Sequence, residues 1–414
     1  MPDRRFSPGP FGHIRLLELS DEKGEWCGKL FADLGADVIK IEPPGGAPER
    51  QIGPFYHDVP HPERSLHFWH YNTSKRGITL NLKTESGRAL FRDLVKTTDV
   101  LLETFAPGYL PSLGLGYKQL REINPSLIMC SLTSFGQRGP WRDFLGSDLI
   151  HLAAGGQMES CGYEQHQDPD QIPIAPGAGS AWATGSHYAF MSIAAAVYYR
   201  TLNGTGQYID ASVHSACALT TEGKVPQWVY SNQHVTRGQR EVYKDYRCKD
   251  GKYVITGGAQ GGTRMNPRFL SILAEWMDEH GLAEDLKEPQ YQEQETVSAR
   301  RDHISEVLER FCLQITSEEA YHGAQKRGFT WGAIRAPEDM IEDPHWQQWG
   351  FWVKVEHPEV GETITYPGPG SIYPASPWKI SRRAPLIGEH NSEVFAELGL
   401  GQPEILVLRE TGVV

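Results

Sequence analysis

The chain has 414 residues, of which 39% are hydrophobic and 10% aromatic, and its 52 acidic side chains outnumber its 40 basic ones, for a formal net charge of −12 at pH 7. A surface that binds nucleic acid needs clustered Lys and Arg, so this balance argues against nucleic acid or an anionic membrane as the main partner. The apolar share suffices for a buried core and excludes wholesale disorder, and the length predicts about two to three domains.

The N-terminal residues carry charge with no apolar stretch behind them, so no secretory signal is expected. One stretch, from Ile172 to Tyr199, lacks Asp, Glu, Lys and Arg. Pro and Gly interrupt its first half, which predicts a buried helix over Ser186–Arg200 rather than a membrane span. The six cysteines have no C-x-x-C spacing. This favours free thiols in the cytoplasm and predicts no bound metal.

Strand and helix patterns alternate along the first third of the chain. Helix patterns cover Trp26–Leu34, which Gly35 ends, and Glu85–Thr97. Apolar runs predict strands over Ile14–Leu19, Ala36–Glu42, Ile78–Leu82, Asp99–Thr104 and Leu127–Leu132. Such alternation predicts an α/β fold: a large doubly wound, Rossmann-like domain with helices on both faces of a parallel sheet.

The composition changes near Gly223. Ile209–Ala218 is interpreted as the start of a helix, and Gly251–Thr256 as a strand. Helices with acidic outer faces are predicted over Arg268–His280 and Arg300–Leu313. We therefore expect a small inserted α+β domain at 223–330, with the large domain built from 1–222 and a return segment at 331–414. The return segment is rich in Pro and Trp, which predicts extended, turn-rich structure and a closing helix near Asn391–Leu398.

Two motifs have both a functional and a plain interpretation. The glycine loop, with Gly257, Gly258, Gln260 and Gly261, could cradle an anion or be a simple turn. The pair Lys75-Arg76, which precedes a predicted strand, could bind phosphate or be a solvated loop charge. Both alternatives stay open on the residues alone.

Two further groups favour the plain interpretation. Histidines and acids cluster in a Pro-rich segment, where a surface loop is preferred over a metal site because no helical spacing of ligands is evident; they are His57, Asp58, His61, Glu63, His67 and His70. Cys130, at a strand end, could be a nucleophile, but a buried structural cysteine is the commoner case.

Several motifs occur in the order found in the CoA-transferases of family III, the CaiB/BaiF family. They are Gly35–Gly45, Asn72-x-x-Lys75-Arg76, Asp99–Glu103 with Pro107-Gly108, Leu113–Tyr117, Ile123–Pro125, Phe135–Pro140, Asp343–His345 and Ala384–His390. The chain resembles this family over almost its whole length. The resemblance implies two subunits interlocked like chain links, and CoA or acyl-CoA as a substrate without a covalently bound cofactor.

The resemblance also implies a catalytic position that this chain does not fill. In the family an aspartate, four residues before a Gly at the head of a buried helix, attacks the acyl-CoA carbonyl and carries the CoA as a thioester. Ala181, four residues before Gly185, stands at that position, and the stretch from Ile172 to Tyr199 holds no Asp or Glu. We therefore expect no catalytic residue at this site.

Other residues match or depart from the family's CoA site. The residues that the resemblance assigns to a residual CoA site are Lys40, Asn72, Lys75, Arg76, Thr104, Phe105 and Gln137. Thr104 and Ala106 replace polar residues of the family motif, and Ser147 replaces a His of the racemase branch. Racemase activity is disfavoured because proton transfer between two faces of a carbon needs two such groups.

On this resemblance we expect a catalytically silent subunit, paired with a paralogue that carries the aspartate. The pair would move CoA from an acyl-CoA such as succinyl-CoA to a carboxylic acid, with benzylsuccinate, of toluene degradation, as the most specific expectation. One alternative is a homodimeric acyl-CoA enzyme that uses Asp148, Glu159 or Asp170. The other is a non-catalytic acyl-CoA-binding protein.

Overall fold

The computed structural model of the chain describes residues 8–161, 172–177, 179–221, 224–232, 244–257 and 265–414. These residues form two compact units. The first combines residues 8–161 and 172–232 with 350–414, and the second lies between 244 and 349. The expected α/β class with a large doubly wound domain is confirmed.

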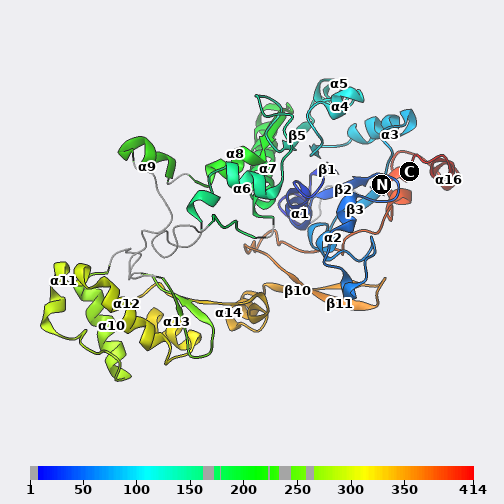
Figure 1. Cartoon of the computed structure of the whole chain (residues 1–414). Helices are drawn as coiled ribbons and strands as arrows, with labels where there is room; N and C mark the ends of the chain where they lie inside the picture. Colours follow the sequence, from blue (N-terminus) through cyan, green and yellow to red (C-terminus); the bar gives the residue numbers. More distant parts are fainter. Residues whose placement is uncertain (1–7, 162–171, 178, 222–223, 233–243, 258–264) are drawn as a thin grey trace. The chain divides into compact units, whose positions relative to one another are not determined.

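A six-stranded parallel sheet forms the centre of the first unit, in the order β3-β2-β1-β4-β5-β6 (Figure 1). Its strands are β1 (Arg15–Leu19), β2 (Asp37–Glu42), β3 (Arg76–Thr79), β4 (Val100–Glu103), β5 (Ile128–Thr133) and β6 (Tyr208–Ser212). Leu17 of β1 is in register with Ile39 of β2 on one side and Leu101 of β4 on the other. The strand order therefore reverses between β1 and β4, which is where open α/β sheets bind their ligands.

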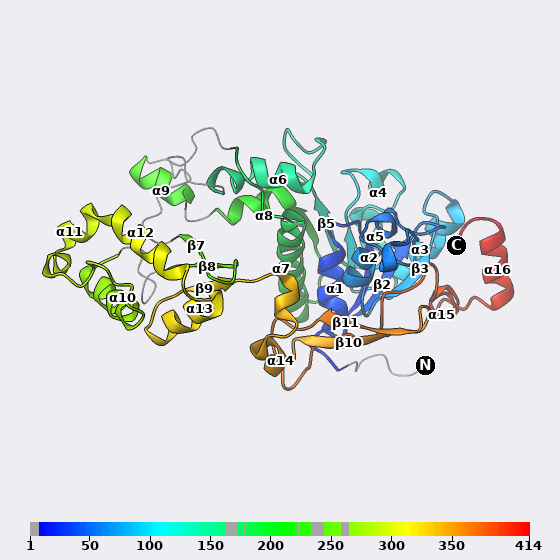
Figure 2. The same cartoon turned by 60° about the horizontal axis from the view of Figure 1, so that its bottom comes forward.

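Successive strand residues point to opposite faces of the sheet, and each face has its own core. Leu16 and Val38 pack with α1 and α7, whereas Leu17 and Ile39 pack with α3 and α5. The helices of the first unit are α1 (Glu25–Asp33), α2 (Leu66–Tyr71), α3 (Glu85–Val95), α4 (Tyr109–Ser112), α5 (Tyr117–Ile123), α6 (Asp148–Ala154), α7 (Ser180–Asn203), α8 (Val213–Leu219), α9 (Lys224–Ser231), α15 (Asn391–Ala396) and α16 (Gln402–Glu410). α1 and α7 lie side by side in Figure 1 and in Figure 2.

Two sequence expectations need correction in the sheet. The helix start expected over Ile209–Ala218 is wrong in its first part: Tyr208–Ser212 form the sixth strand, which pairs in parallel with β5, and α8 begins only at Val213. The strand expected at Ile78–Leu82 ends at Thr79, after which the amide of Asn81 bonds the carbonyl of Val413 near the C-terminus.

Helix α7 is longer than the sequence predicts. It begins at Ser180 instead of Ser186, after Gly179 in a left-handed conformation with φ of 73°. Gly185 lies inside this helix. A Cβ at this position would lie 2.8 Å from Val213 of α8, so the glycine allows the two helices to pack closely. Among the described residues no helix is both long and apolar enough to cross a membrane.

The C-terminal part of the chain returns to the sheet of the first unit. It contains an antiparallel hairpin of β10 (Trp352–His357) and β11 (Glu362–Pro367), so it is less irregular than expected. The amide of Gly77 in β3 donates to His390 Nδ1 at 3.1 Å, and that of Thr79 to Asn391 Oδ1 at 2.8 Å. His390, the last residue of the Ala384–His390 motif, and Asn391 after it thereby hold the edge strand of the sheet.

The second unit has an antiparallel sheet and a helical core of its own. Its elements are β7 (Asp245–Arg247), β8 (Tyr253–Ile255), α10 (Pro267–Glu279), α11 (Gln294–Ala299), α12 (Arg301–Cys312), α13 (Ser317–Lys326), β9 (Gly332–Ile334) and α14 (Pro344–Trp349). Trp331 is buried in this core against Trp276, and β9 pairs with β8. The second unit therefore runs to Trp349, beyond the boundary at residue 330 that the composition suggested.

Candidate active site

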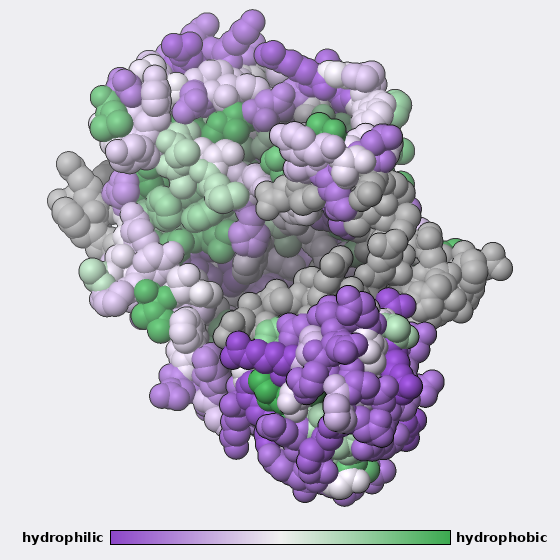
Figure 3. All heavy atoms as spheres, turned by 90° about the vertical axis from the view of Figure 1, so that its left-hand side faces the viewer, coloured by the Kyte–Doolittle hydropathy of each residue, from purple (hydrophilic) through white to green (hydrophobic). Residues whose placement is uncertain are grey.

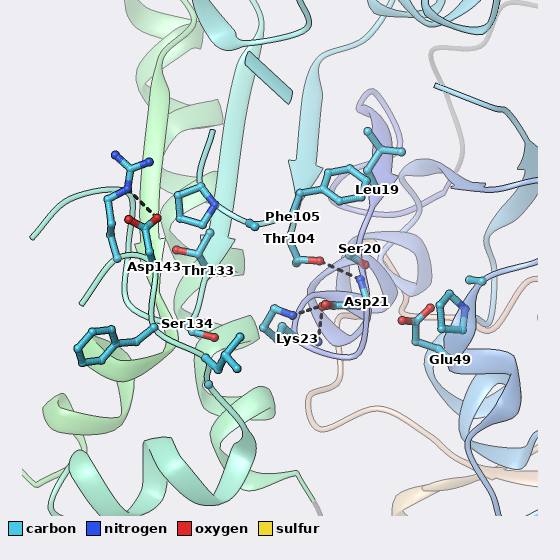
Figure 4. Close-up of a pocket in the computed structure, with 18 of the residues that line it drawn as sticks. Leu19, Ser20, Asp21, Lys23, Glu49, Thr104, Phe105, Thr133, Ser134 and Asp143 are labelled. Atoms are coloured by element: carbon cyan, nitrogen blue, oxygen red, sulfur yellow. Dashed lines mark hydrogen bonds and ion pairs between the residues drawn. The ribbon is translucent and has the colours of Figure 1, made fainter. Parts of the chain in front are cut away.

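A pocket of about 690 Å³ opens where the strand order reverses. Its walls come from the loops that follow the carboxyl ends of β1, β2, β4 and β5. The residues labelled in Figure 4 are Leu19, Ser20, Asp21, Lys23, Glu49, Thr104, Phe105, Thr133, Ser134 and Asp143. This is the position at which a doubly wound fold places a ligand.

Two residues of the expected CoA site, Thr104 and Phe105, line this pocket. Thr104 Oγ1 accepts a hydrogen bond from the amide of Asp21 at 2.9 Å, which joins the loops after β4 and β1. The amide of Phe105 donates to the carboxylate of Glu103 at 2.8 Å. Burial raises the pKa of Glu103 to about 7, although hydrogen bonds from Ser131 and Phe105 oppose the shift.

The charged side chains that line the pocket are mostly paired with one another. Lys23 forms an ion pair with Asp21, and Arg142 Nε donates to Asp143 at 3.1 Å (Figure 4). Glu49, from a short 3-10 turn, makes no ion pair with a described residue. Burial raises the pKa of Glu49 to about 7, with Lys40 opposing the rise and Glu25 adding to it.

Beside the pocket, α1 covers a buried charge cluster formed by Glu18, Glu25, Lys40 and Lys75, each at most 1% exposed. Lys75 Nζ lies 2.8 Å from Glu18 Oε2, and Lys40 Nζ lies 2.9 Å from Glu25 Oε1. Asn72 completes the cluster: its amide donates to Glu25 Oε1 at 2.9 Å, and its carbonyl accepts from Lys75 at 2.9 Å. Two carboxylates thus face two ammonium groups, as buried charges require.

Local structure explains how α1 can lie over this cluster. A Cβ at Gly28 would lie only 1.7 Å from Glu18 Oε2, so a glycine is needed for the helix to approach the strand. Burial alone would raise the pKa of Glu25, but Lys40 and Lys75, with hydrogen bonds from His67 and Asn72, hold that pKa well below its ordinary value. Burial would lower the pKa of Lys40, but Glu25 and Glu18 raise it. Glu25 and Lys40 are therefore ionised, whereas burial lowers the pKa of Lys75.

The other expected CoA-site residues lie apart from the pocket lining. Arg76 donates to Asp37 at the amino end of β2 and to Glu393 and Glu397 at 2.8 and 2.9 Å. The amide of Gln137 donates to Asp210 Oδ1 of β6 at 2.9 Å. The basic side chains that the resemblance assigned to CoA, Lys40, Lys75 and Arg76, are all engaged with carboxylates, and their role toward CoA stays a prediction.

The position expected for the nucleophile lies in the first turn of α7. Ala181 is fully buried there, and Asp148 Oδ1 accepts from the amides of Ala181 and Trp182 at 2.8 and 3.3 Å. Lys23 connects this turn with the pocket. Its Nζ lies 5.7 Å from the centre of the Trp182 ring, and its carbonyl accepts from Ser186 Oγ at 2.6 Å. The pocket residue Lys23 therefore contacts the start of α7, although Ala181 and Trp182 do not themselves line the pocket.

Several other expectations have clear outcomes. Cys130 is fully buried, and burial raises the pKa of its thiol far above the ordinary range, so it is no nucleophile. His67 and His70 lie on α2, not on a surface loop, where His67 faces Glu25 at 3.3 Å and His70 stacks on Trp26. In the part of the chain that the structure describes, no group of three or more potential ligands could hold a metal.

Some expected residues lie outside the described residues. These are Asp170, one of the alternative carboxylates, and Gly258, Gln260 and Gly261 of the glycine loop. Gly257 is described, and a Cβ there would lie 2.6 Å from the carbonyl of Thr330, which is a structural reason for the glycine. Glu159 lies in a 3-10 turn, Met158–Ser160.

Glu18 and Glu25, the partners of Lys40 and Lys75, were not among the site residues predicted from the sequence. A signal was present, because Glu18 and Lys40 each interrupt an otherwise apolar predicted strand. Charges in buried strands require partners. Asp21, Lys23 and Glu49 of the pocket gave no such signal, since they lie in loops.

Known proteins are similar to this chain over nearly its whole length. It is 32% identical over 409 residues to the succinyl-CoA:(R)-benzylsuccinate CoA-transferase subunit BbsE of Thauera aromatica, with 98% of each chain covered. It is 29% identical to the succinyl-CoA–D-citramalate CoA-transferase of Chloroflexus aurantiacus, again with 98% of each covered. A crystal structure of a CaiB/BaiF family protein from Brucella suis matches with a TM-score of 0.82 at 28% identity, covering 95% of this chain and 100% of that one.

The structural match agrees with the doubly wound sheet. The family model described as CoA-transferase family III matches residues 14–391, which include the whole sheet and all of the second unit. The resemblance seen in the motifs is therefore confirmed, and the chain belongs to CoA-transferase family III.

Proposed function

We propose that this chain is a subunit of a heteromeric CoA-transferase, and that a paralogous subunit carries the catalytic aspartate. The observation that carries this proposal is the fully buried Ala181 in the first turn of α7. A carboxylate at that place would serve as nucleophile and then as leaving group for CoA transfer. An alanine methyl can do neither.

The surroundings of Ala181 support the proposal. The nearest carboxylate, Asp148, is already bound by two backbone amides at the start of α7, which favours a structural role. A relative at 32% identity is itself named as a subunit. For the acyl groups, we propose succinyl-CoA as donor and a carboxylic acid as acceptor, with benzylsuccinate as the specific candidate. The six free cysteines are consistent with a place in the cytoplasm.

The surface of the first unit supports the need for a partner. Large apolar side chains are exposed on and around α6, α7 and α9: Leu145 (95%), Leu149 (54%), Tyr198 (68%), Leu202 (68%) and Tyr230 (89%). Figure 3 shows broad hydrophobic areas on the first unit, whereas the second unit is mostly hydrophilic. Extensive exposed apolar surface is typical of interfaces, and we propose that the catalytic paralogue covers it in an interlocked dimer.

Mass spectrometry tests the proposal. The wild-type chain and Ala181→Asp are each incubated with succinyl-CoA and other acyl-CoA donors and examined for covalently bound CoA. We expect no adduct on either, because a carboxylate placed among Ala, Trp and Gly without hydrogen-bond donors tends to stay protonated. An adduct on the wild-type chain alone contradicts the proposal.

The same experiment addresses the homodimeric alternative. If an adduct forms, Asp148→Asn distinguishes its site, since the amide keeps a hydrogen-bond acceptor for α7 but is no nucleophile. Expression from the native locus provides an independent check: we expect a second family III chain to co-purify. A purified homodimer with full CoA-transferase turnover contradicts the proposal.

A further inference from the structure

The pocket at the strand reversal has an unusual balance of charge for a CoA site. Coenzyme A carries a pyrophosphate and a ribose phosphate, and proteins bind such groups with Arg, Lys or the amino ends of helices. The described residues that line this pocket include three carboxylates, Asp21, Glu49 and Asp143, and two cations, Lys23 and Arg142. The lining therefore has one more carboxylate than cations, and Glu49, whose pKa burial raises to about 7, supplies the extra negative charge above that pH.

Neither cation is free to receive a phosphate. Lys23 is paired with Asp21, whose Oδ1 also accepts the amide of Lys23 at 3.1 Å. Arg142 is paired with the adjacent Asp143, and both are well exposed. Glu49 adds a carboxylate with no ion-pair partner among the described residues, and it occupies the first turn of a short 3-10 helix. A phosphate could therefore reach either cation only by competing with its carboxylate partner.

The nearby lysines do not correct this balance. Lys40 and Lys75 are fully buried and bound to Glu18 and Glu25. Moving either ammonium group toward a phosphate would leave a buried carboxylate unpaired, which is strongly unfavourable. The amino end of α1 is also occupied, because Glu25 lies in its first turn and Asp21 accepts its first amides.

We propose that Asp21, Glu49 and Asp143 exclude the phosphates of coenzyme A from this pocket. The inference rests on the proposed function for its consequence in the complex: one CoA site per pair of unlike chains, provided by the paralogue. The pocket still offers apolar walls at Leu19 and Phe105 and the hydroxyl groups of Thr133 and Ser134. It therefore suits an uncharged ligand better than a polyphosphate.

Isothermal titration calorimetry tests the exclusion on the full-length chain with two probes, CoA and pantetheine, which lacks the phosphates. The triple variant Asp21→Asn, Glu49→Gln, Asp143→Asn removes the carboxylates and frees Lys23 and Arg142. We expect its affinity for CoA to rise about tenfold or more, with the affinity for pantetheine unchanged. The matched control Asp93→Asn, Glu122→Gln, Glu410→Gln changes charge equally on helices whose side chains do not line the pocket, and we expect no gain.

An equal CoA affinity in the wild type and the triple variant overturns the inference, as does an equal gain for pantetheine. If the triple variant does not fold, Glu49→Gln alone is the substitute, because Glu49 makes no ion pair that the change could break. A salt series on the wild type is a second measurement. Salt screens repulsion, so CoA affinity should stay level or rise with salt, and a steep fall overturns the inference.

The last test is the number of CoA molecules that the heteromeric complex binds. We expect one CoA bound per pair of chains, and two would overturn the inference. Its failure is distinguishable from failure of the proposed function, because reversible CoA binding without a covalent adduct refutes only the exclusion. A covalent CoA adduct on the wild-type chain refutes the proposed function.

Discussion

Two groups of charged residues lie next to each other near the carboxyl ends of the parallel strands, and they differ in kind. The buried charge cluster under α1 pairs Glu18 and Glu25 with Lys40 and Lys75 at distances of 2.8 to 3.3 Å, out of reach of water. The pocket charges Asp21, Glu49 and Asp143 face a solvent-accessible cavity and exceed their cationic partners. The first group holds the fold together, and the second determines what can enter.

The difference follows from where each group lies in the chain. Glu18 and Lys40 are strand residues in register with each other, so their side chains are committed to the interior and must neutralise one another. The pocket residues lie in loops after the strands, where Asp143 is well exposed to water and Glu49 is only 5% exposed. Substitutions in the buried charge cluster should therefore mainly change the stability of the fold. Substitutions in the pocket should mainly change ligand selectivity and have smaller effects on stability.

The largest effect is expected for Lys40→Met. This change leaves the carboxylate of Glu25 without its ammonium partner in a site that is fully buried. Breaking one side of a buried ion pair costs about 3–5 kcal/mol of unfolding free energy, which urea denaturation measures. The control Lys96→Met breaks an exposed pair with Asp93 and should cost less than about 1 kcal/mol. Equal losses for the two variants would contradict the structural role of the cluster.

The next largest expected effect is a pH dependence of the unfolding free energy, caused by Glu103 at the boundary between the buried charge cluster and the pocket. Burial raises the pKa of Glu103 from 4.5 to about 7, so its contribution to stability is complete below pH 4.5 and is lost as the pH rises to about 7. Glu103→Gln cannot ionise. Between these pH values the wild type should therefore lose about 3 kcal/mol of unfolding free energy relative to the variant. Parallel stability curves for the two proteins would show that Glu103 is not perturbed.

A smaller loss is expected for Gly146→Ala at the inner wall of the pocket. The added methyl group would lie 2.6 Å from Nε2 of His151, a fully buried side chain, and would also meet Ser134. Overpacking of this kind costs about 1–3 kcal/mol, to be read from thermal or urea unfolding. Gly370→Ala, whose methyl group would meet nothing within 4 Å, is the matched control and should be nearly neutral. A neutral Gly146→Ala would mean that this wall yields easily.

The smallest effect is expected at the start of α7. Asp148→Ala removes the acceptor for the amides of Ala181 and Trp182 and should cost about 1 kcal/mol of unfolding free energy. Asp148→Asn keeps an acceptor and should cost less. If the two variants lose the same amount, the contribution of Asp148 comes from its charge and not from the hydrogen bonds.

Sequence patterns by themselves determined the class of fold and the family. Period-two apolar runs and helix faces are local, so the strands β1, β2, β4 and β5 and the helices α1 and α3 could be predicted within a few residues. Ordered motifs along the whole chain, together with the missing acid at Ala181, were also visible without coordinates. The exception was β6, where Tyr208–Ser212 becomes a strand only because β5 offers a free edge.

Only the tertiary structure decided which charges serve the fold and which face the pocket. The resemblance assigned Lys40, Lys75 and Arg76 alike to a CoA site, but their partners Glu18, Glu25 and Asp37 come from β1, α1 and β2. The acids of the pocket likewise converge from the loops after β1, β2 and β5. Ion pairing depends on distances of a few ångströms between residues far apart in the chain, and no local pattern carries that information.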